Sequence, residues 1–337
     1  MRSIRVLGVV RSNAAASAVE PLFKELLSRG HLTSLFAEGG GQAAHRLTIP
    51  FTKLTERSQL LEAFEEKIDV VVTGLSWRRE FEQIAEVEAK RRNIALVHIE
   101  DFWGAHVRTN VKADVLLVID SMAAHMAHVA RPGIRTAVVG LPGLFPVVPG
   151  SLLRRRLEDA RASTAARLIV YPDSGQEALG TLPMLVESIR QTRTPVVLLP
   201  KWNPNVCDEA SDDGRTWAER CEEIIAPLRR EGKVLDVEGP TDEVVLCADL
   251  TASGFSVLLF RSLYGGKSAL TLWTPFVAQL LKEETGLAET PLMMRGYPVL
   301  MQPQPLDAIL MQKARSSDSK PFDPAGAADA VLSLDLV

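Results

Sequence analysis

Short apolar runs rich in Val, Ile and Leu alternate along the chain with longer stretches whose apolar residues recur at helical spacing. The short runs predict buried strands at 4–10, 32–37, 69–74, 94–99, 115–119, 136–139, 168–171, 195–199, 234–237, 250–252 and 269–273. The longer stretches predict helices that include 78–92, 121–130, 180–191, 216–231, 242–247 and 254–263. Strands that alternate with helices form parallel sheets with right-handed crossovers. The pattern therefore predicts an α/β fold.

This alternation occurs on both sides of a Pro- and Gly-rich stretch at 140–150. A chain of 337 residues also exceeds what one hydrophobic core usually serves. We therefore predict an N-terminal Rossmann-like domain over 1–145 and a C-terminal Rossmann-like domain over 146–305. A loop and helix over 306–337 could dock on the first domain. The two domains are expected to face each other across a cleft that holds the ligand.

Composition and charge narrow the classes of function. A formal net charge of −4 provides no broad basic surface for a nucleic acid or an anionic membrane. The cysteines, Cys207, Cys221 and Cys247, show no CxxC spacing, and no carboxylate or thiol cluster lies near His125 and His128 in the sequence. No apolar run is long enough to span a bilayer. We therefore expect a cytoplasmic protein with no metal site and no bound cofactor. A homo-oligomer is compatible with this composition.

Residues suited to acid–base chemistry and to stacking on a substrate gather directly after the predicted strand 94–99. They are Glu100, Asp101, Trp103, His106 and Arg108. Ligands of open parallel sheets bind at the carboxyl ends of the strands, which is where this loop lies. We therefore predict that Glu100, Asp101 or His106 is catalytic and that Trp103 and Arg108 contact the substrate. The alternative is a structural loop in which Trp103 fills the core.

A second predicted site is the run Ser253-Gly254-Phe255-Ser256, which follows the strand predicted at 250–252. Gly254 would permit close approach of the backbone, and a helix start with serine hydroxyls would suit a diphosphate. The alternative is an ordinary Ser-capped helix. Other residues in loops after predicted strands are expected to contact the ligand, namely Arg11, Ser12, Asn13, Ser174, Gly175, Gln176 and Lys201.

Several familiar motifs are absent from the sequence: no Walker lysine motif, no GxGxxG after the first strand and no GxSxG occur. Three other segments together resemble motifs of the GT-B glycosyltransferases, such as the lipid II-forming N-acetylglucosaminyltransferases, and of the related non-hydrolysing UDP-N-acetylglucosamine 2-epimerases. These segments are His98-Ile-Glu-Asp101 with Gly104, Asp173-Ser-Gly-Gln-Glu-Ala178, and Cys247-Ala-Asp-Leu-Thr-Ala-Ser-Gly254 with Gly265-Gly-Lys267 and Gln279.

The resemblance spans most of the chain and implies a nucleotide-sugar site in the C-terminal domain. In that case Ser253 and Gly254 would hold the diphosphate, and residues 174–176 would line the same pocket. Gln279 would contact the sugar hydroxyls. Glu100 and its neighbours would then face the acceptor.

Four positions depart from the patterns of these families. The first-loop histidine of the transferases is replaced by Ser12-Asn-Ala-Ala-Ala16, and their ribose-binding glutamate falls at Phe260 or Arg261. The catalytic aspartate of the epimerases falls near Ser76, and their catalytic histidine has no counterpart at 171–177. The last two departures disfavour standard epimerase chemistry.

We therefore predict a glycosyltransferase that moves a sugar from a nucleotide diphosphate, UDP in particular, to a small-molecule or lipid-linked acceptor. Metal-independent catalysis is expected, because no DxD-type carboxylate pair lies beside the predicted phosphate pocket. One alternative is a nucleotide-sugar 2-epimerase or hydrolase, which needs no acceptor. Another is a non-catalytic nucleotide-sugar-binding partner protein, which the missing first-loop histidine and ribose carboxylate suggest.

Overall fold

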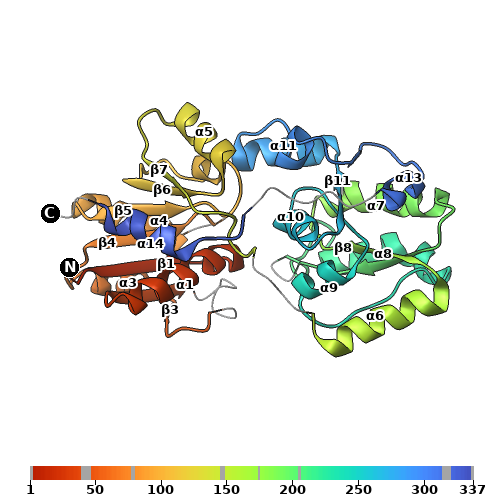
Figure 1. Ribbon diagram of the computed structural model, residues 1–337, viewed down its shortest axis with the longest axis horizontal. Coiled ribbons are helices and arrows are strands. Elements are labelled where there is room, and N and C mark those ends of the chain that lie inside the picture. Colours follow the sequence, from red (N-terminus) through yellow and green to blue (C-terminus); the bar gives the residue numbers. More distant parts are fainter. Residues whose placement is uncertain are drawn as a thin grey trace. The chain divides into compact units, whose positions relative to one another are not determined.

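The computed structural model divides the chain into two compact units (Figure 1). It describes residues 3–38, 47–76, 80–144, 149–173, 175–203, 206–312 and 320–334. Unit 1 comprises Met1–Phe145, Glu284–Gly286 and Ser319–Val337, and unit 2 comprises Pro146–Glu283 and Leu287–Asp318. Among the described residues, no helix is both long and apolar enough to cross a membrane.

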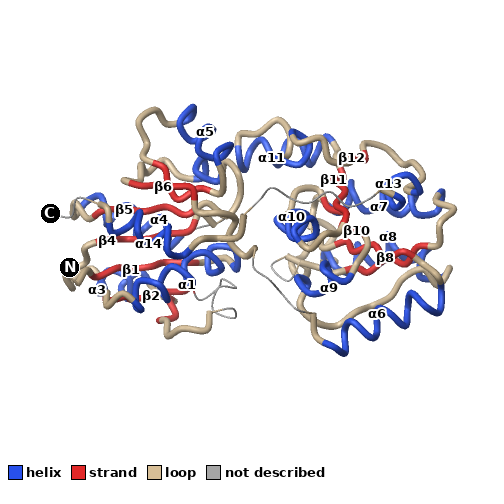
Figure 2. The backbone as a smooth tube through the Cα atoms, in the orientation of Figure 1, coloured by secondary structure: helices blue, strands red, loops and turns tan. Residues whose placement is uncertain are grey.

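Unit 1 contains a parallel sheet in the strand order β3-β2-β1-β4-β5-β6-β7 within its described residues (Figure 2). The strands are β1 (Arg5–Val10), β2 (Leu32–Glu38), β3 (Thr52–Leu54), β4 (Val70–Gly74), β5 (Ala95–Ile99), β6 (Val115–Val118) and β7 (Thr136–Val138). The register places Val6 of β1 between Thr33 of β2 and Val70 of β4. Because all strands are parallel, their carboxyl ends lie at one edge of the sheet.

Helices cover both faces of this sheet, as the two-residue period of its strands requires. The helical elements are α1 (Asn13–Ser28), α3 (Arg57–Ala63), α4 (Glu80–Arg91), the 3₁₀ helix η1 (Ala105–Arg108), α5 (Ser121–Ala130) and α14 (Pro324–Leu332). Val70 and Val72 pack in the core formed with α1 and α14, whereas Val71 packs on the opposite face with α3 and α4. Figure 1 shows α14, drawn in blue, beside α1.

Unit 2 contains a second parallel sheet in the order β12-β11-β10-β8-β9. Its strands are β8 (Arg167–Tyr171), β9 (Val196–Pro200), β10 (Leu250–Ser253), β11 (Ser268–Leu272) and β12 (Val299–Leu300). Its helices are α6 (Ser151–Thr164), α7 (Ala178–Gln191), α8 (Trp217–Arg230), α9 (Thr241–Cys247), α10 (Val257–Tyr264), α11 (Pro275–Thr285), α12 (Pro291–Met294) and α13 (Asp307–Met311). The last two residues of α11 belong to unit 1. Ile169 packs with α7 and α8, and Leu168 packs with α6 and α9. The prediction of two Rossmann-like domains is confirmed.

Two local predictions are wrong. The strand expected at 234–237 is reduced to a single bridge between Val234 and Leu198. The helix expected at 254–263 begins instead at Val257, because Ser253 still belongs to β10. Within the C-terminal segment 306–337, α13 packs in the core of unit 2, and the last helix, α14, packs in unit 1.

Candidate functional site

The loop after β5 in unit 1 is folded tightly and is largely buried. Gly104 has a φ of 82°, and a Cβ atom at this position would lie 2.3 Å from the carbonyl oxygen of Thr285. Only glycine fits this left-handed position and this close approach. The chain then forms η1, which brings His106 back toward Glu100, the residue that directly follows β5.

Glu100 and His106 form a buried carboxylate–imidazole pair. The Oε1 atom of Glu100 lies 2.6 Å from Nδ1 of His106 and accepts a hydrogen bond of 3.1 Å from the His106 backbone N–H. Both side chains are about 1% exposed or less. Burial raises the pKa of Glu100, while the contacts with His106 act in the opposite direction. A carboxylate in this position orients the imidazole, as in catalytic acid–base pairs.

Asp101 and Arg108 make the second ion pair of the same loop. The Arg108 guanidinium donates to Asp101 Oδ1 over 3.3 Å and to the carbonyl oxygen of Leu75 over 2.7 Å. It also lies 3.2 Å from Glu284. Burial raises the pKa of Asp101, and the Arg108 charge opposes that rise. Arg108 therefore ties the ends of β4 and β5 to residues 284–286.

Trp103 occupies the position that the structural alternative predicts. Its side chain is fully buried, and its indole N–H donates to Asp120 Oδ2 over 3.0 Å. Asp120 is also the N-cap of α5, where its other oxygen accepts from the Ala123 backbone N–H. In this conformation Trp103 packs the loop and does not present a ring face to solvent.

The first loop, which follows β1, holds three predicted ligand residues. Arg11 forms an ion pair with Glu38, and its backbone N–H donates to Glu82 Oε1 over 3.2 Å. Asn13 begins α1, and its carbonyl oxygen accepts from the Ser17 hydroxyl. Burial raises the pKa of Glu38, although Arg11 opposes this shift. The Arg11 side chain is about one quarter exposed.

Ser12 links this loop to the end of β4. It caps α1 by accepting from the Ala15 backbone N–H, and its own N–H donates to Ser76 Oγ over 3.2 Å. Ser76 Oγ in turn donates to Glu82 Oε1 over 2.7 Å. Glu82 is fully buried. The hydroxyls of Ser12 and Ser76 therefore lie beside a buried carboxylate at the carboxyl edge of the sheet.

Sequence reasoning missed Glu82 and Glu86, which α4 buries one turn apart. Glu86 accepts from the hydroxyls of Thr73 and Thr109 over 3.1 and 2.8 Å, and it lies 3.2 Å from His98 Nε2. The available signal was their spacing, because residues at i and i+4 share a helix face. On α4 that face is the one that also buries Phe81 and Ala85. This cluster is a second carboxylate–histidine contact in unit 1.

In unit 2, Ser253 and Gly254 converge on a carboxylate. Ser253 Oγ donates to Asp173 Oδ1 over 2.9 Å, and the Gly254 backbone N–H donates to Asp173 Oδ2 over 3.1 Å. Ser253 ends β10, and Asp173 lies two residues beyond the end of the neighbouring strand β8. All three residues are buried. Two donors at the end of β10 thus form a site for the two oxygens of one anionic group.

The start of α10 differs from the prediction. Ser256 is its N-cap and accepts from the Leu258 backbone N–H over 3.3 Å. Phe255 lies between this cap and the strand end and is half-buried. The helix is therefore Ser-capped, as the structural alternative proposes. The two donors at 253–254 belong instead to the end of β10.

Asp173 and Glu177 form an acidic pair at this edge of the sheet. Burial raises the pKa of Asp173 to about 6, although the hydrogen bonds from Ser253 and Gly254 lower it. Burial and the charge of Asp173 raise the pKa of Glu177 to about 7. Gly175 lies between them at a φ of 93°. Ser174 lies outside the described residues.

Three other predicted ligand residues in unit 2 are exposed or have other partners than the Ser253–Gly254 pair of donors. Lys201 donates to the carbonyl oxygens of Val237 and Gly239 over 3.1 and 2.9 Å, and burial lowers its pKa. Gln176 is exposed. Gln279 is also exposed and donates to Glu283, one turn later on α11. Within the described part of the chain, none of these three side chains forms a hydrogen bond or ion pair with Asp173 or Ser253.

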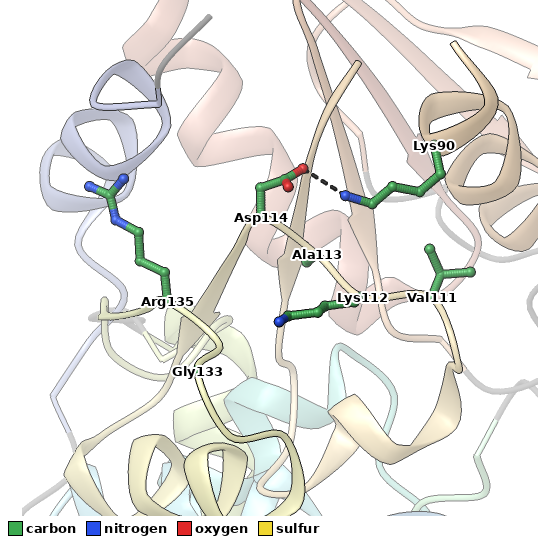
Figure 3. Close-up of a pocket in the computed structure, with 7 residues that line it drawn as sticks. All are labelled: Lys90, Val111, Lys112, Ala113, Asp114, Gly133 and Arg135. Carbon is green, nitrogen blue, oxygen red and sulfur yellow. Dashed lines mark hydrogen bonds and ion pairs between the residues drawn. The ribbon is translucent and has the colours of Figure 1, made fainter. Parts of the chain in front are cut away.

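Two further features could provide a competing site among the described residues, a metal centre and a cavity in unit 1. The described part of the chain contains no group of three or more His, Cys, Asp or Glu side chains that could hold a metal ion. A cavity of about 620 Å³ in unit 1 is lined by Lys90, Lys112, Asp114 and Arg135 among others, and Lys90 bonds Asp114 over 2.9 Å (Figure 3). Asp114 immediately precedes β6, so this cavity lies at the amino ends of the strands. Ligands of such sheets bind at the opposite edge.

Known structures share this fold, although no protein-family model and no curated protein sequence matches the chain. A Listeria monocytogenes protein assigned as a UDP-N-acetylglucosamine 2-epimerase has a TM-score of 0.65 at 14% identity, covering 99% of this chain and 96% of its own. The Methanocaldococcus jannaschii UDP-GlcNAc 2-epimerase, solved with UDP-GlcNAc and UDP, has a TM-score of 0.63 at 11% identity and covers 98% and 99%. Acinetobacter baumannii MurG has a TM-score of 0.56 at 14% identity and covers 98% and 100%. The chain therefore has the fold that UDP-N-acetylglucosamine 2-epimerases share with MurG-like GT-B glycosyltransferases, as its strand-end motifs predict.

Proposed function

We propose that the chain is a metal-independent glycosyltransferase that uses a nucleoside-diphosphate sugar, with UDP as the nucleotide. The observation that carries this proposal is the pair of donors at 253–254, which already holds two oxygens of one carboxylate. A phosphate group presents its oxygens to hydroxyl and backbone N–H donors in a similar way. The choice of UDP is supported by the ligands of the M. jannaschii epimerase of the same fold.

In this proposal each unit contributes one part of the reaction. Unit 2 binds the diphosphate of the donor at Ser253 and Gly254, which stabilise the charge that develops on the leaving group. Unit 1 provides the Glu100–His106 pair, in which His106 takes the proton of the acceptor hydroxyl and Glu100 stabilises the imidazolium. The bond from the anomeric carbon to the diphosphate breaks, and the bond to the acceptor oxygen forms.

Product analysis tests this function directly. The full chain is incubated in EDTA with UDP-linked sugars, with and without a panel of small-molecule and lipid-linked acceptors, and the products are followed by NMR spectroscopy. We expect UDP and a glycosylated acceptor to form only when an acceptor is present, and we expect the rate to be unchanged by EDTA. A C2-epimerised sugar formed without any acceptor would establish the epimerase alternative. Donor binding with no turnover across the acceptor panel would establish the non-catalytic alternative.

Replacement of Gly254 by alanine is expected to weaken binding of the UDP-sugar by about tenfold or more, since the donor N–H must stay accessible at close range. A Cβ atom at this position would lie 3.2 Å from Cγ2 of Val277. The added methyl group therefore fills space at the donor pair and forces its neighbour to shift. Calorimetric titration measures the affinity.

The matched control for Gly254→Ala is Asp236→Asn, which changes an exposed ion pair with Arg229 elsewhere in unit 2. This control is expected to bind the donor as the unmodified protein does. Circular dichroism establishes that both variants are folded. Unchanged affinity in a folded Gly254→Ala protein would show that the diphosphate binds elsewhere.

A further inference from the structure

The carboxylate of Asp173 occupies the donor pair to which the proposed function assigns the diphosphate. Its two oxygens lie 2.9 Å from Ser253 Oγ and 3.1 Å from the Gly254 nitrogen. Each of these atoms carries one N–H or O–H proton to donate. An ionised acceptor makes the stronger hydrogen bond, so the carboxylate competes well for both donors.

We propose that Asp173 is a built-in competitor at this site, so that a nucleoside-diphosphate sugar binds only when the carboxylate releases Ser253 and Gly254. The inference rests on the proposed function and adds to it the residue that controls binding of the nucleotide sugar. Asp173 is a specificity-determining residue in this scheme, because it sets the affinity for a dianionic diphosphate without taking part in the chemistry.

The surroundings of Asp173 strengthen the repulsion between its negative charge and a bound diphosphate. The negative charge of Asp173 raises the pKa of Glu177, the N-cap residue of α7, so a second carboxyl group lies close enough to interact with it. The other titratable groups that interact with Asp173 are Tyr171 on β8 and Cys221 on α8, and both become harder to ionise in its presence. A bound diphosphate would add two further negative charges to this group. Like charges at close range in a buried site are strongly unfavourable.

The displaced carboxylate also stays close to the ligand. Asp173 is buried and its side chain reaches only one methylene from the backbone, which follows the core strand β8. It therefore remains within a few ångströms of the diphosphate, where protonation removes the repulsion. Donor binding is then favoured when the carboxylate is neutral. The affinity is expected to fall as the pH rises through the range in which Asp173 ionises, about 6.

The test is calorimetric titration with UDP-N-acetylglucosamine, whose two phosphates are both esterified and keep a constant charge from about pH 5 to about pH 8. The titrations use the full chain in EDTA. For the unmodified protein we expect affinity at about pH 8 to be about tenfold or more below that at about pH 5.5. At an intermediate pH, titrations in buffers of different ionisation enthalpy are expected to show net uptake of protons on binding.

Asp173→Asn is the decisive variant, because it removes the charge while it keeps the shape of the side chain. We expect it to bind the donor at about pH 8 at least about tenfold more tightly than the unmodified protein, with little dependence on pH. Asp173→Ala, which frees both donors, is expected to behave in the same way. Asp236→Asn, which removes an exposed carboxylate of the same unit, is expected to keep the unmodified pH dependence.

The outcomes separate this inference from the proposed function. Donor binding that is independent of pH, without proton uptake, would overturn the role of Asp173 and leave the function standing, even if the Asp173 variants failed to fold. Folded Asp173 variants with unchanged affinity at about pH 8 would have the same meaning. An absence of binding in every folded variant at both pH values would overturn the proposed function, and the inference with it.

Discussion

Glu100→Gln is expected to lower kcat by about 10²–10⁴-fold, the usual contribution of general acid–base catalysis, while the affinity for the donor stays unchanged. In the structure Glu100 Oε1 lies 2.6 Å from His106 Nδ1. A glutamine side chain can still accept a hydrogen bond there, but it cannot neutralise an imidazolium. His106→Ala should cost a similar factor, and the double variant should be no slower than the slower single variant, because the two side chains act as one unit.

Unit 1 contains a matched control for this experiment, since Glu86 and His98 form a second buried carboxylate–histidine contact. Glu86→Gln changes the same functional group at the same degree of burial, so a purely structural effect would appear in both variants. We expect kcat to fall only in Glu100→Gln and to recover in part in Glu100→Asp, which restores the carboxylate. Equal losses in Glu100→Gln and Glu86→Gln would mean that the Glu100–His106 pair supports the loop and that the base lies elsewhere.

The sheets were predictable from sequence because their strands are short and apolar on both faces. Val70, Val71 and Val72 pack into two different cores, so the run has no polar alternation and appears as one apolar block. Less regular elements were missed for the opposite reason. The helix α6 contains Leu153 and Leu157 as its buried apolar residues among several arginines, which is a weak amphipathic signal.

The strand expected at 234–237 shows the limit of local patterns. Its apolar residues do reach the sheet, but only Val234 pairs, with Leu198 at the edge strand β9. An apolar run of four residues suits a strand or an extended edge segment equally well. Pairing partners decide between the two, and they are not present in the local sequence.

The sequence predicted which loops hold the candidate sites, but it did not predict which side chains contact each other there. Strand-end loops could be identified because each parallel sheet places them at one edge. That edge holds Glu100 and His106 in unit 1, and Ser253 and Gly254 in unit 2. The partner of Ser253, however, is Asp173, which is 80 residues away in the chain. A carboxylate in a loop is typical of a solvated or ligand-binding group. No sequence pattern shows that Asp173 accepts hydrogen bonds from Ser253 and Gly254.

A pH-dependent loss of stability is expected in unit 2 and traces to Glu177. Its pKa of about 7 lies above the ordinary value of 4.5, because burial and Asp173 disfavour its ionised form. For a carboxyl group with a raised pKa in the folded state, the stabilising contribution is complete below the unfolded-state pKa and is lost as the pH rises through the folded-state pKa. Between about pH 4.5 and pH 7 this loss amounts to at most about 3 kcal/mol, reduced by the water that reaches the half-buried side chain.

Glu177→Gln removes the charge. The free energy of unfolding of this variant should therefore equal that of the unmodified protein at about pH 4.5 and exceed it at about pH 8. Hydrogen exchange of the β8 amides is the appropriate measurement, because it reports on unit 2 in a chain whose two units need not unfold together. Glu187→Gln is the control, since Glu187 lies on the same helix with a side chain 46% exposed. A Glu177→Gln protein whose β8 protection falls with pH as steeply as in the unmodified protein would show that Glu177 ionises normally.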